Sequence, residues 1–242
     1  MNRLRIQHTC EVRYTQTFQY SAQALRLTPR RDRFQHTLHW ALHAPGQRAE
    51  QLDAHGNIMH LLTLEAPHRF IEVVVTGLVE VATGEQVLPH EGPLSPLAYL
   101  ATTALTQPTP AVLEFAEGHR PAHGATWDWA ARLARGVREL SPAQATAVDQ
   151  AHALLGACRA AGVPARFVSG YRHLEEERAE RTAWVDIWNA SQDGWMALDV
   201  DRVEAARSRH CRLAVGRDYL EAAPVRTHRP GERVETLRIR DQ

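Results

Sequence analysis

The sequence predicts an α+β protein in which an N-terminal antiparallel β domain precedes a second, mixed core domain. Residues up to about 82 alternate apolar and polar side chains in short runs, which are broken by the turn sequences PRRD, APGQ and DAHGN. Residues from about 97 onward show helical patterns that begin with Ser or Thr and are followed by strand-like runs. The stretch TGEQVLPHEGPLSP between them collects Gly and Pro without periodicity. We therefore expect a first domain over 1–82, a linker over 83–96 and a second domain over 97–242.

The individual elements follow from the same patterns. In FIEVVVTGLVEV, apolar residues alternate with polar ones as they do in a half-buried strand. Three segments, SPLAYLATTAL, TPAVLEFAEG and TWDWAARLARGVREL, each open with a residue type that caps a first helical turn. A longer helix is predicted over 142–161, with Ser141 as N-cap, Pro142 at its first position and Gly162 at its stop. The runs ARFVSGYRH, TAWVDIWNA and GWMALDV are predicted as strands.

Composition limits the classes of function. The chain has 28 basic and 28 acidic residues and a formal net charge of +0, so it offers no broad basic surface to nucleic acid. All of the basic residues are Arg, which excludes a Schiff-base or general-base lysine. No apolar run approaches the roughly 20 residues that span a bilayer, and the N-terminus lacks the apolar block of a signal peptide. We expect a soluble, cytoplasmic protein that contacts neither nucleic acid nor membrane.

The positions of the cysteines and histidines do not favour thiol or metal chemistry. The three cysteines are widely spaced and odd in number: Cys10, Cys158 and Cys211. This spacing fits neither a disulfide framework nor a C-x-x-C metal site, so we expect buried free thiols. His36, His39 and His43 have a helix-like spacing, but they lie in the β-rich half, where strand parity places the first opposite the other two. We predict no metal and no cofactor.

An ordered set of short motifs resembles a known family. The segments are ATAVDQAH, TAWVDIW, GWMALD and LAVGRDYLEAAPVR, preceded in the first half by RYTQTFQYSAQALRLTPR and LDAHGNIMHLLTLEAPHR. Together they resemble the bacterial transglutaminase-like proteins of the papain-like cysteine superfamily, with the β-rich domain found ahead of that core. The resemblance implies three motifs, G-V-C-x-D-x-A-H, H-A-W and G-W-x-x-x-D, which carry a Cys-His-Asp triad.

Two of the three triad positions are replaced in this chain. Ala147 stands where the resemblance places the cysteine, and Thr182 stands where it places the histidine. Asp199 is retained, as are Asp149 and His152 of the first motif. Alanine has no atom that can attack a carbonyl, and threonine is no base near neutral pH. The resemblance therefore implies a transglutaminase-like fold that lacks the nucleophile and the base of the catalytic triad.

The function that we predict is binding without catalysis. We expect a catalytically inactive transglutaminase-like protein that acts as a peptide- or protein-binding subunit within a peptide-modifying or peptide-ligating system. The predicted groove lies beside the start of helix 142–161, with Trp184, Trp195, Asp149 and His152 as binding residues. The resemblance suggests an intact transglutaminase-like relative or an ATP-dependent peptide ligase as the partner, and a homodimer is the simplest alternative.

Two other interpretations remain open at this stage. The chain could be an active amide hydrolase or transamidase with a rebuilt site, although Cys158 lies on the apolar stripe of its helix and Cys211 points away from the adjacent His210. Ala147 could also be an engineered replacement of cysteine. The separate changes at Ala145 and Thr182 argue against an engineered origin.

Overall fold

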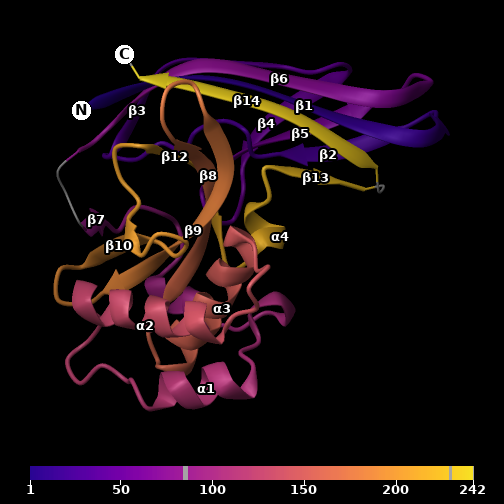
Figure 1. Ribbon diagram of the computed structural model, residues 1–242. Helices are drawn as coiled ribbons and strands as arrows, with labels where there is room; N and C mark the ends of the chain where they lie inside the picture. Colours follow the sequence, from indigo (N-terminus) through magenta and orange to yellow (C-terminus); the bar gives the residue numbers. More distant parts are fainter. Residues whose placement is uncertain (84–86, 229–230, 242) are drawn as a thin grey trace.

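The computed structural model describes residues 1–83, 87–228 and 231–241, and it is mostly β with few helices (Figure 1). Its strands form three antiparallel sheets, and its three longer helices gather at the end of the molecule away from the first sheet (Figure 1). An N-terminal region of strands is therefore confirmed. The predicted α+β class holds only coarsely, because strands far outnumber helices.

The first two sheets combine strands from both ends of the chain. The first has the order β14 (Glu232–Asp241), β1 (Asn2–Phe18), β6 (His68–Val81) and β3 (Gln35–His43). The second has the order β13 (Val225–Thr227), β2 (Ser21–Leu25), β5 (Ile58–Leu64) and β4 (Gln47–Leu52). The predicted strand FIEVVVTGLVEV is part of β6, in which Ile71, Val73 and Val75 are buried while Glu72 is exposed.

The third sheet carries the positions of the predicted site. Its order is β11 (Glu204–Ala205), β10 (Gly194–Asp199), β9 (Ala179–Asn189), β8 (Ala165–His173) and β12 (His210–Gly216), and β7 (Val87–Pro89) also pairs with β10. Helices pack on one face of this sheet, where Ala183, Val185 and Leu198 join a core with Leu154 and Leu155. The long β8–β9 hairpin reaches from these helices to the first sheet (Figure 1). At that end Tyr171 of β8 packs in a second core together with residues of β1.

The helices confirm most of the predicted caps and correct one. The helices are α1 (Pro110–Glu117), α2 (Trp127–Leu140), α3 (Ala147–Ala160) and α4 (Tyr219–Ala222). Thr109 and Thr126 cap α1 and α2 as predicted. Segment 95–105 instead forms two 3-10 turns, η1 (Pro96–Leu100) and η2 (Ala104–Thr106), because the backbone at Ala101 is extended between them.

The start of α3 differs from the prediction. The helix begins at Ala147, and Ser141 is the C-cap of α2 rather than the N-cap of α3. Thr146 is the N-cap: its Oγ1 accepts from the Asp149 N–H at 3.2 Å, and an Asp149 carboxylate oxygen accepts from the Thr146 N–H at 2.9 Å. This reciprocal capping box satisfies two N–H groups, which the Ser141 and Pro142 pair cannot do.

The domain boundaries at 82, 83–96 and 97–242 stay a prediction. Residues 84–86 of the predicted linker lie outside the described residues, and 87–89 form β7 in the third sheet. The C-terminal strands β13 and β14 pair with β2 and β1, so the sheets of the N-terminal region contain residues from the second predicted domain. In the described parts of the chain, no helix is long and apolar enough to cross a membrane.

Candidate functional site

Ala147 is the first residue of α3, the helix end where the resemblance places a nucleophile. Only a methyl group projects from it. The neighbouring Asp149 is exposed and serves the capping box, where hydrogen bonds from Thr146 lower the pKa of its carboxyl group. The predicted binding residue Asp149 therefore has a local structural role in starting the helix.

His152, the second retained residue of the helix motif, connects α3 to α4. Its Nε2 accepts from the backbone N–H of Tyr219 at 3.1 Å, and its ring lies 5.2 Å from the Phe167 ring. Burial lowers the pKa of His152, which favours the neutral imidazole that can accept this bond. The contacts account for this histidine as a packing and hydrogen-bonding residue.

Thr182 and Asp199 lie on neighbouring strands of the third sheet, β9 and β10, but have different surroundings. Thr182, on β9, is 7% exposed, and its Oγ1 has no hydrogen-bond partner among the described residues. Asp199 ends β10 and is fully buried. One of its oxygens accepts from Arg172 of β8 and lies 3.0 Å from Nε2 of His210 of β12. A histidine therefore does pair with Asp199, but it comes from a different strand than the family motif implies.

Arg172 and His210 stabilise the negative charge of Asp199. Burial alone would raise the pKa of its carboxyl group, but the hydrogen bond and charge of His210, together with Arg172, outweigh burial and lower the pKa. Arg172 also pairs with Glu180 and lies 3.0 Å from Asp201. The Nδ1 atom of His210 is buried and has no hydrogen-bond partner among the described residues. The group is an ionised carboxylate between an arginine and a histidine with one free ring nitrogen.

The two predicted binding tryptophans are interior residues. Trp184 is 1% exposed and Trp195 is 0% exposed. The Trp184 ring lies 5.2 Å from the His210 ring and occupies the space in which a Cβ at Gly170 would stand. The Trp195 Nε1 donates to His90 at 3.2 Å, and the Arg166 guanidinium stacks 4.3 Å from its ring centroid. Both indoles pack in the interior, and Trp184 borders a cavity of about 30 Å³, about the volume of one water molecule.

Every thiol of the chain is inaccessible. Cys10, Cys158 and Cys211 are free and buried. Burial raises the pKa of Cys10 and Cys158 to about 12 and raises the pKa of Cys211 as well. Because the thiolate is the nucleophilic form, none of them is a nucleophile near neutral pH. Within 1–83, 87–228 and 231–241, no group of three or more His, Cys, Asp or Glu side chains is arranged to hold a metal.

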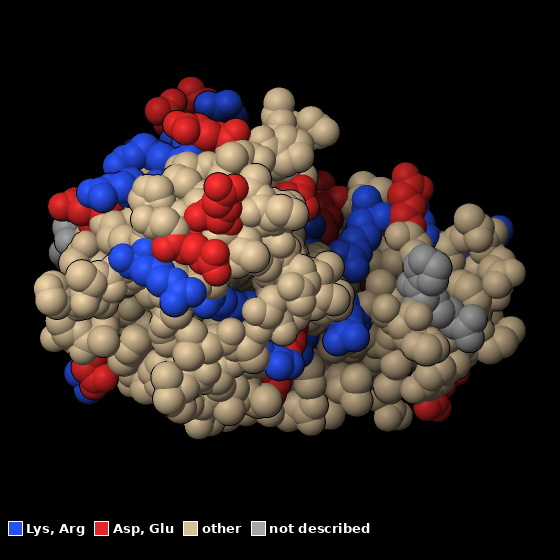
Figure 2. All heavy atoms as spheres, turned by 90° about the horizontal axis from the view of Figure 1, so that it is seen from below, with Lys and Arg blue, Asp and Glu red and all other residues tan. Residues whose placement is uncertain are grey.

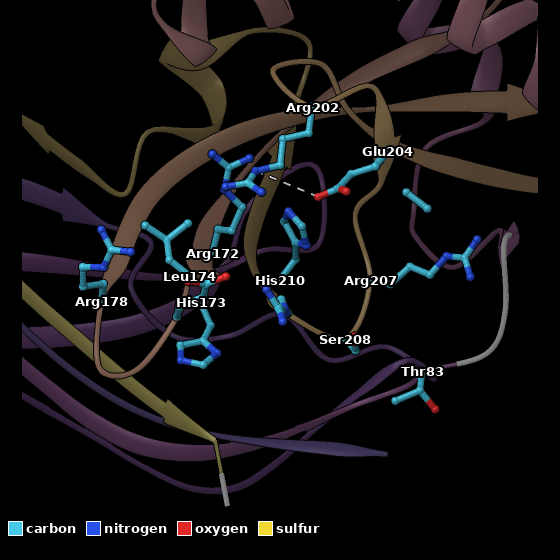
Figure 3. A pocket seen from close by; sticks show the side chains of 13 residues that line it. Thr83, Arg172, His173, Leu174, Arg178, Arg202, Glu204, Arg207, Ser208 and His210 are labelled. Atoms are coloured by element: carbon cyan, nitrogen blue, oxygen red, sulfur yellow. Dashed lines mark ion pairs between the residues drawn. The ribbon is translucent and has the colours of Figure 1, made fainter.

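A cavity of about 590 Å³ opens beside Arg172 and His210, the two partners of Asp199 (Figure 3). The end of β8, the β8–β9 connection and the segment between β10 and β12 line it. Its basic lining residues are Arg172, His173, Arg178, Arg202, Arg207, Arg209 and His210. Arg172 and His210 thus face both the cavity and Asp199, whereas Ala147, Thr182 and the two tryptophans are not among its described lining residues. Such a lining can bind an anion.

Sequence reasoning did not identify this cavity. The signal was present as a density of arginines in DRVEAARSRHCR. Seen from below, the molecule shows basic and acidic side chains interspersed on the visible face, and neither sign forms a continuous patch there (Figure 2).

Comparisons with known proteins agree with the fold and the motifs. Residues 4–80 match the bacterial transglutaminase-like N-terminal region, and residues 128–200 match the transglutaminase-like superfamily core. An uncharacterised protein of Mycobacterium leprae is 25% identical over 93% of this chain and 92% of its own length. The crystal structure of a candidate cysteine protease from Cytophaga hutchinsonii has a TM-score of 0.71 at 15% identity, covering 100% of this chain and 90% of that one. This chain is a transglutaminase-like protein, with the bacterial N-terminal region ahead of a core of papain-like fold.

Proposed function

We propose that this protein is a catalytically inactive transglutaminase-like protein that binds a peptide or a protein partner. The supporting observation is the residue at the start of α3, where Ala147 occupies the nucleophile position of the family motif. The three thiols elsewhere are buried and have raised pKa values, so none replaces it. Without a nucleophile the fold forms no covalent acyl intermediate. Binding is then the function that the site can support.

The partner that we propose belongs to a peptide-modifying or peptide-ligating system in the cytoplasm. The candidates are an intact transglutaminase-like relative, an ATP-dependent peptide ligase and a second copy of this chain. Because Trp184 and Trp195 are buried, the contact surface does not depend on them. The arginine-lined cavity beside Asp199 is the alternative contact surface.

A second candidate function, a rebuilt amide-cleaving site, has one observation in its favour. Asp199 orients His210 through a 3.0 Å contact, as a carboxylate orients the base of a hydrolytic triad. The other ring nitrogen of His210, however, has no hydrogen-bond partner among the described residues, so no hydroxyl or thiol is poised for proton transfer to it. Asp199 and His210 form a dyad that lacks the third member.

Activity measurements separate the two functions. The full chain is incubated with a glutamine-containing peptide and a primary amine, with and without iodoacetamide, and products are measured by mass spectrometry. We expect no hydrolysis or amine incorporation above a heat-denatured control. Turnover that is lost in His210→Gln and Asp199→Asn, but kept in the cavity-lining control His173→Gln, would establish the rebuilt site instead.

Binding is tested separately. Sedimentation of the full chain is measured alone, with a panel of peptides by competition, and with the two candidate partner proteins. We expect a complex with one of these ligands or a homodimer. A protein that stays monomeric and binds none of them would contradict the proposed function.

A further inference from the structure

We infer that the arginine-lined cavity binds the carboxylates of an acidic peptide segment. This inference rests on the proposed peptide-binding function and specifies the chemistry of the ligand. The cavity lies beside the dyad of Asp199 and His210 and does not include the α3 N-terminus. It is therefore separate from the position at which the family motif places its nucleophile.

Charge is the first observation. Five arginines line the cavity, against two acidic residues, Glu175 and Glu204. Arg172 is already paired with Glu180, Asp199 and Asp201. The remaining four are Arg178, Arg202, Arg207 and Arg209. A chain with a formal net charge of +0 thus concentrates guanidinium groups at one opening.

The pairing of these four arginines leaves donors for a ligand. Arg202 has a carboxylate neighbour, Glu204, but the two groups are 4.0 Å apart with side chains 48% and 54% exposed. An exposed pair at that distance is worth about 0–1 kcal/mol, so a better-placed acceptor can displace it. The Nε of Arg207 is buried and has no hydrogen-bond partner among the described residues.

The buried His210 is the second, independent observation. Its side chain is 5% exposed, it lines the cavity, and its Nδ1 has no hydrogen-bond partner among the described residues. A buried polar atom without a partner costs about 1–3 kcal/mol, which a ligand that bonds to it would recover. Because Nε2 faces Asp199, Nδ1 is the ring's remaining hydrogen-bonding atom, and a polar group of a bound peptide can pair with it.

The arrangement of the charges favours several separated carboxylates over one compact anion. In Figure 3, Arg172 and Arg202 lie near His210, while Arg178 and Arg207 lie on opposite sides of the cavity. Side chains spaced along a peptide can contact arginines on both sides at once. The guanidinium fork also matches the planar carboxylate in a bidentate geometry.

A sheet edge beside the arginines favours a peptide over other polyanions. Strand β11 is outermost in the third sheet, and both of its residues, Glu204 and Ala205, line the cavity. An extended peptide can add to such an edge through its backbone while its side chains reach neighbouring groups. Sugar-phosphate and polyphosphate chains have no backbone that can form this ladder.

The test uses the full chain and a fluorescein-labelled peptide of alternating Gly and Glu, with five glutamates. Anisotropy is measured for this peptide, for the same peptide with Gln in place of Glu, and for unlabelled polyphosphate and single-stranded DNA as competitors. We expect the Gln peptide to bind at least tenfold more weakly. We also expect the double variant Arg202→Gln with Arg209→Gln to lose at least tenfold in affinity for the Glu peptide, because both residues are exposed and line the cavity.

The control is the double variant Arg132→Gln with Arg135→Gln, which makes the same charge change on the exposed face of α2. It should bind within twofold of the original chain, and circular dichroism should show both double variants folded. Equal binding of the Glu and Gln peptides would overturn the inference and leave the proposed function standing. The inference would also be overturned if both double variants lost the same affinity for the Glu peptide, or if polyphosphate or DNA bound more tightly than the Glu peptide. Failure of the proposed function would appear instead as turnover in the activity assay.

Discussion

Replacement of Asp199 by alanine tests whether this retained motif residue is now structural. The carboxylate is fully buried and accepts from both Arg172 and His210. Removal of one partner of a buried ion pair costs about 3–5 kcal/mol, and a buried hydrogen-bonding group left unpaired costs about 1–3 kcal/mol. Arg172 keeps Glu180 and Asp201 after the change, while His210 loses its Nε2 partner. We therefore expect the lower end of the first range, about 3 kcal/mol.

Thermal unfolding followed by circular dichroism measures this loss. In a chain of this size, 1 kcal/mol corresponds to about 2–4 °C in Tm, so Asp199→Ala should lower Tm by roughly 6–12 °C. Asp199→Asn keeps the shape and one acceptor oxygen, so its Tm should fall by less. The reasoning is refuted if Asp199→Ala unfolds within about 2 °C of the original chain, because the contacts with Arg172 and His210 would then contribute little.

Three further predictions concern protonation and thiol chemistry. Burial lowers the pKa of His8 to about 4. The part of the free energy of unfolding that depends on a neutral His8 is therefore fully present above pH 6.5, and up to about 3 kcal/mol is lost as the pH falls toward 4. Urea midpoints against pH should show a shallower acid loss in His8→Gln, and an unchanged slope would contradict the assignment. A thiol reagent should label the native protein slowly and all 3 cysteines after unfolding; rapid labelling of the native chain would disprove thiol burial. Ala147→Cys should be alkylated near pH 7 faster than an unstructured cysteine, because the α3 N-terminus lowers its pKa. Thr182→His should add little to that rate, since Asp199 is already held by Arg172 and His210, and a large gain would refute this.

Local patterns predicted the elements that depend on near neighbours. The alternation in β6 and the Thr caps of α1 and α2 are properties of a few adjacent residues, and the structure confirms them. The start of α3 was missed because two capping signals compete within six residues. Thr146 with Asp149 forms a reciprocal pair, which outweighs the single signal of Ser141 followed by Pro142.

The surroundings of Asp199 could not be predicted from local patterns. Arg172 lies 27 residues before it and His210 lies 11 residues after it. Arg172 and His210 pair across β8 and β12, and both reach Asp199 at the end of β10, so the group depends on the order of strands in the whole sheet. Strand order is set by tertiary packing, so a motif can specify the carboxylate without specifying its partners. The burial of Trp184 and Trp195 follows from the same packing, because both faces of the third sheet are covered.

The pairing of β14 with β1 has a consequence for the order in which the protein folds during synthesis. Leu4 pairs with Asp241 and Arg13 pairs with Glu232, so β1 receives one of its neighbours only after the whole third sheet has been synthesised. Until then β1 carries an open hydrogen-bonding edge, and β2 awaits β13 in the same way. Open strand edges recruit other chains, and closure of so long a loop slows folding. In a nascent chain of this protein these two edges therefore stay open to other chains until residues 225–241 have been made.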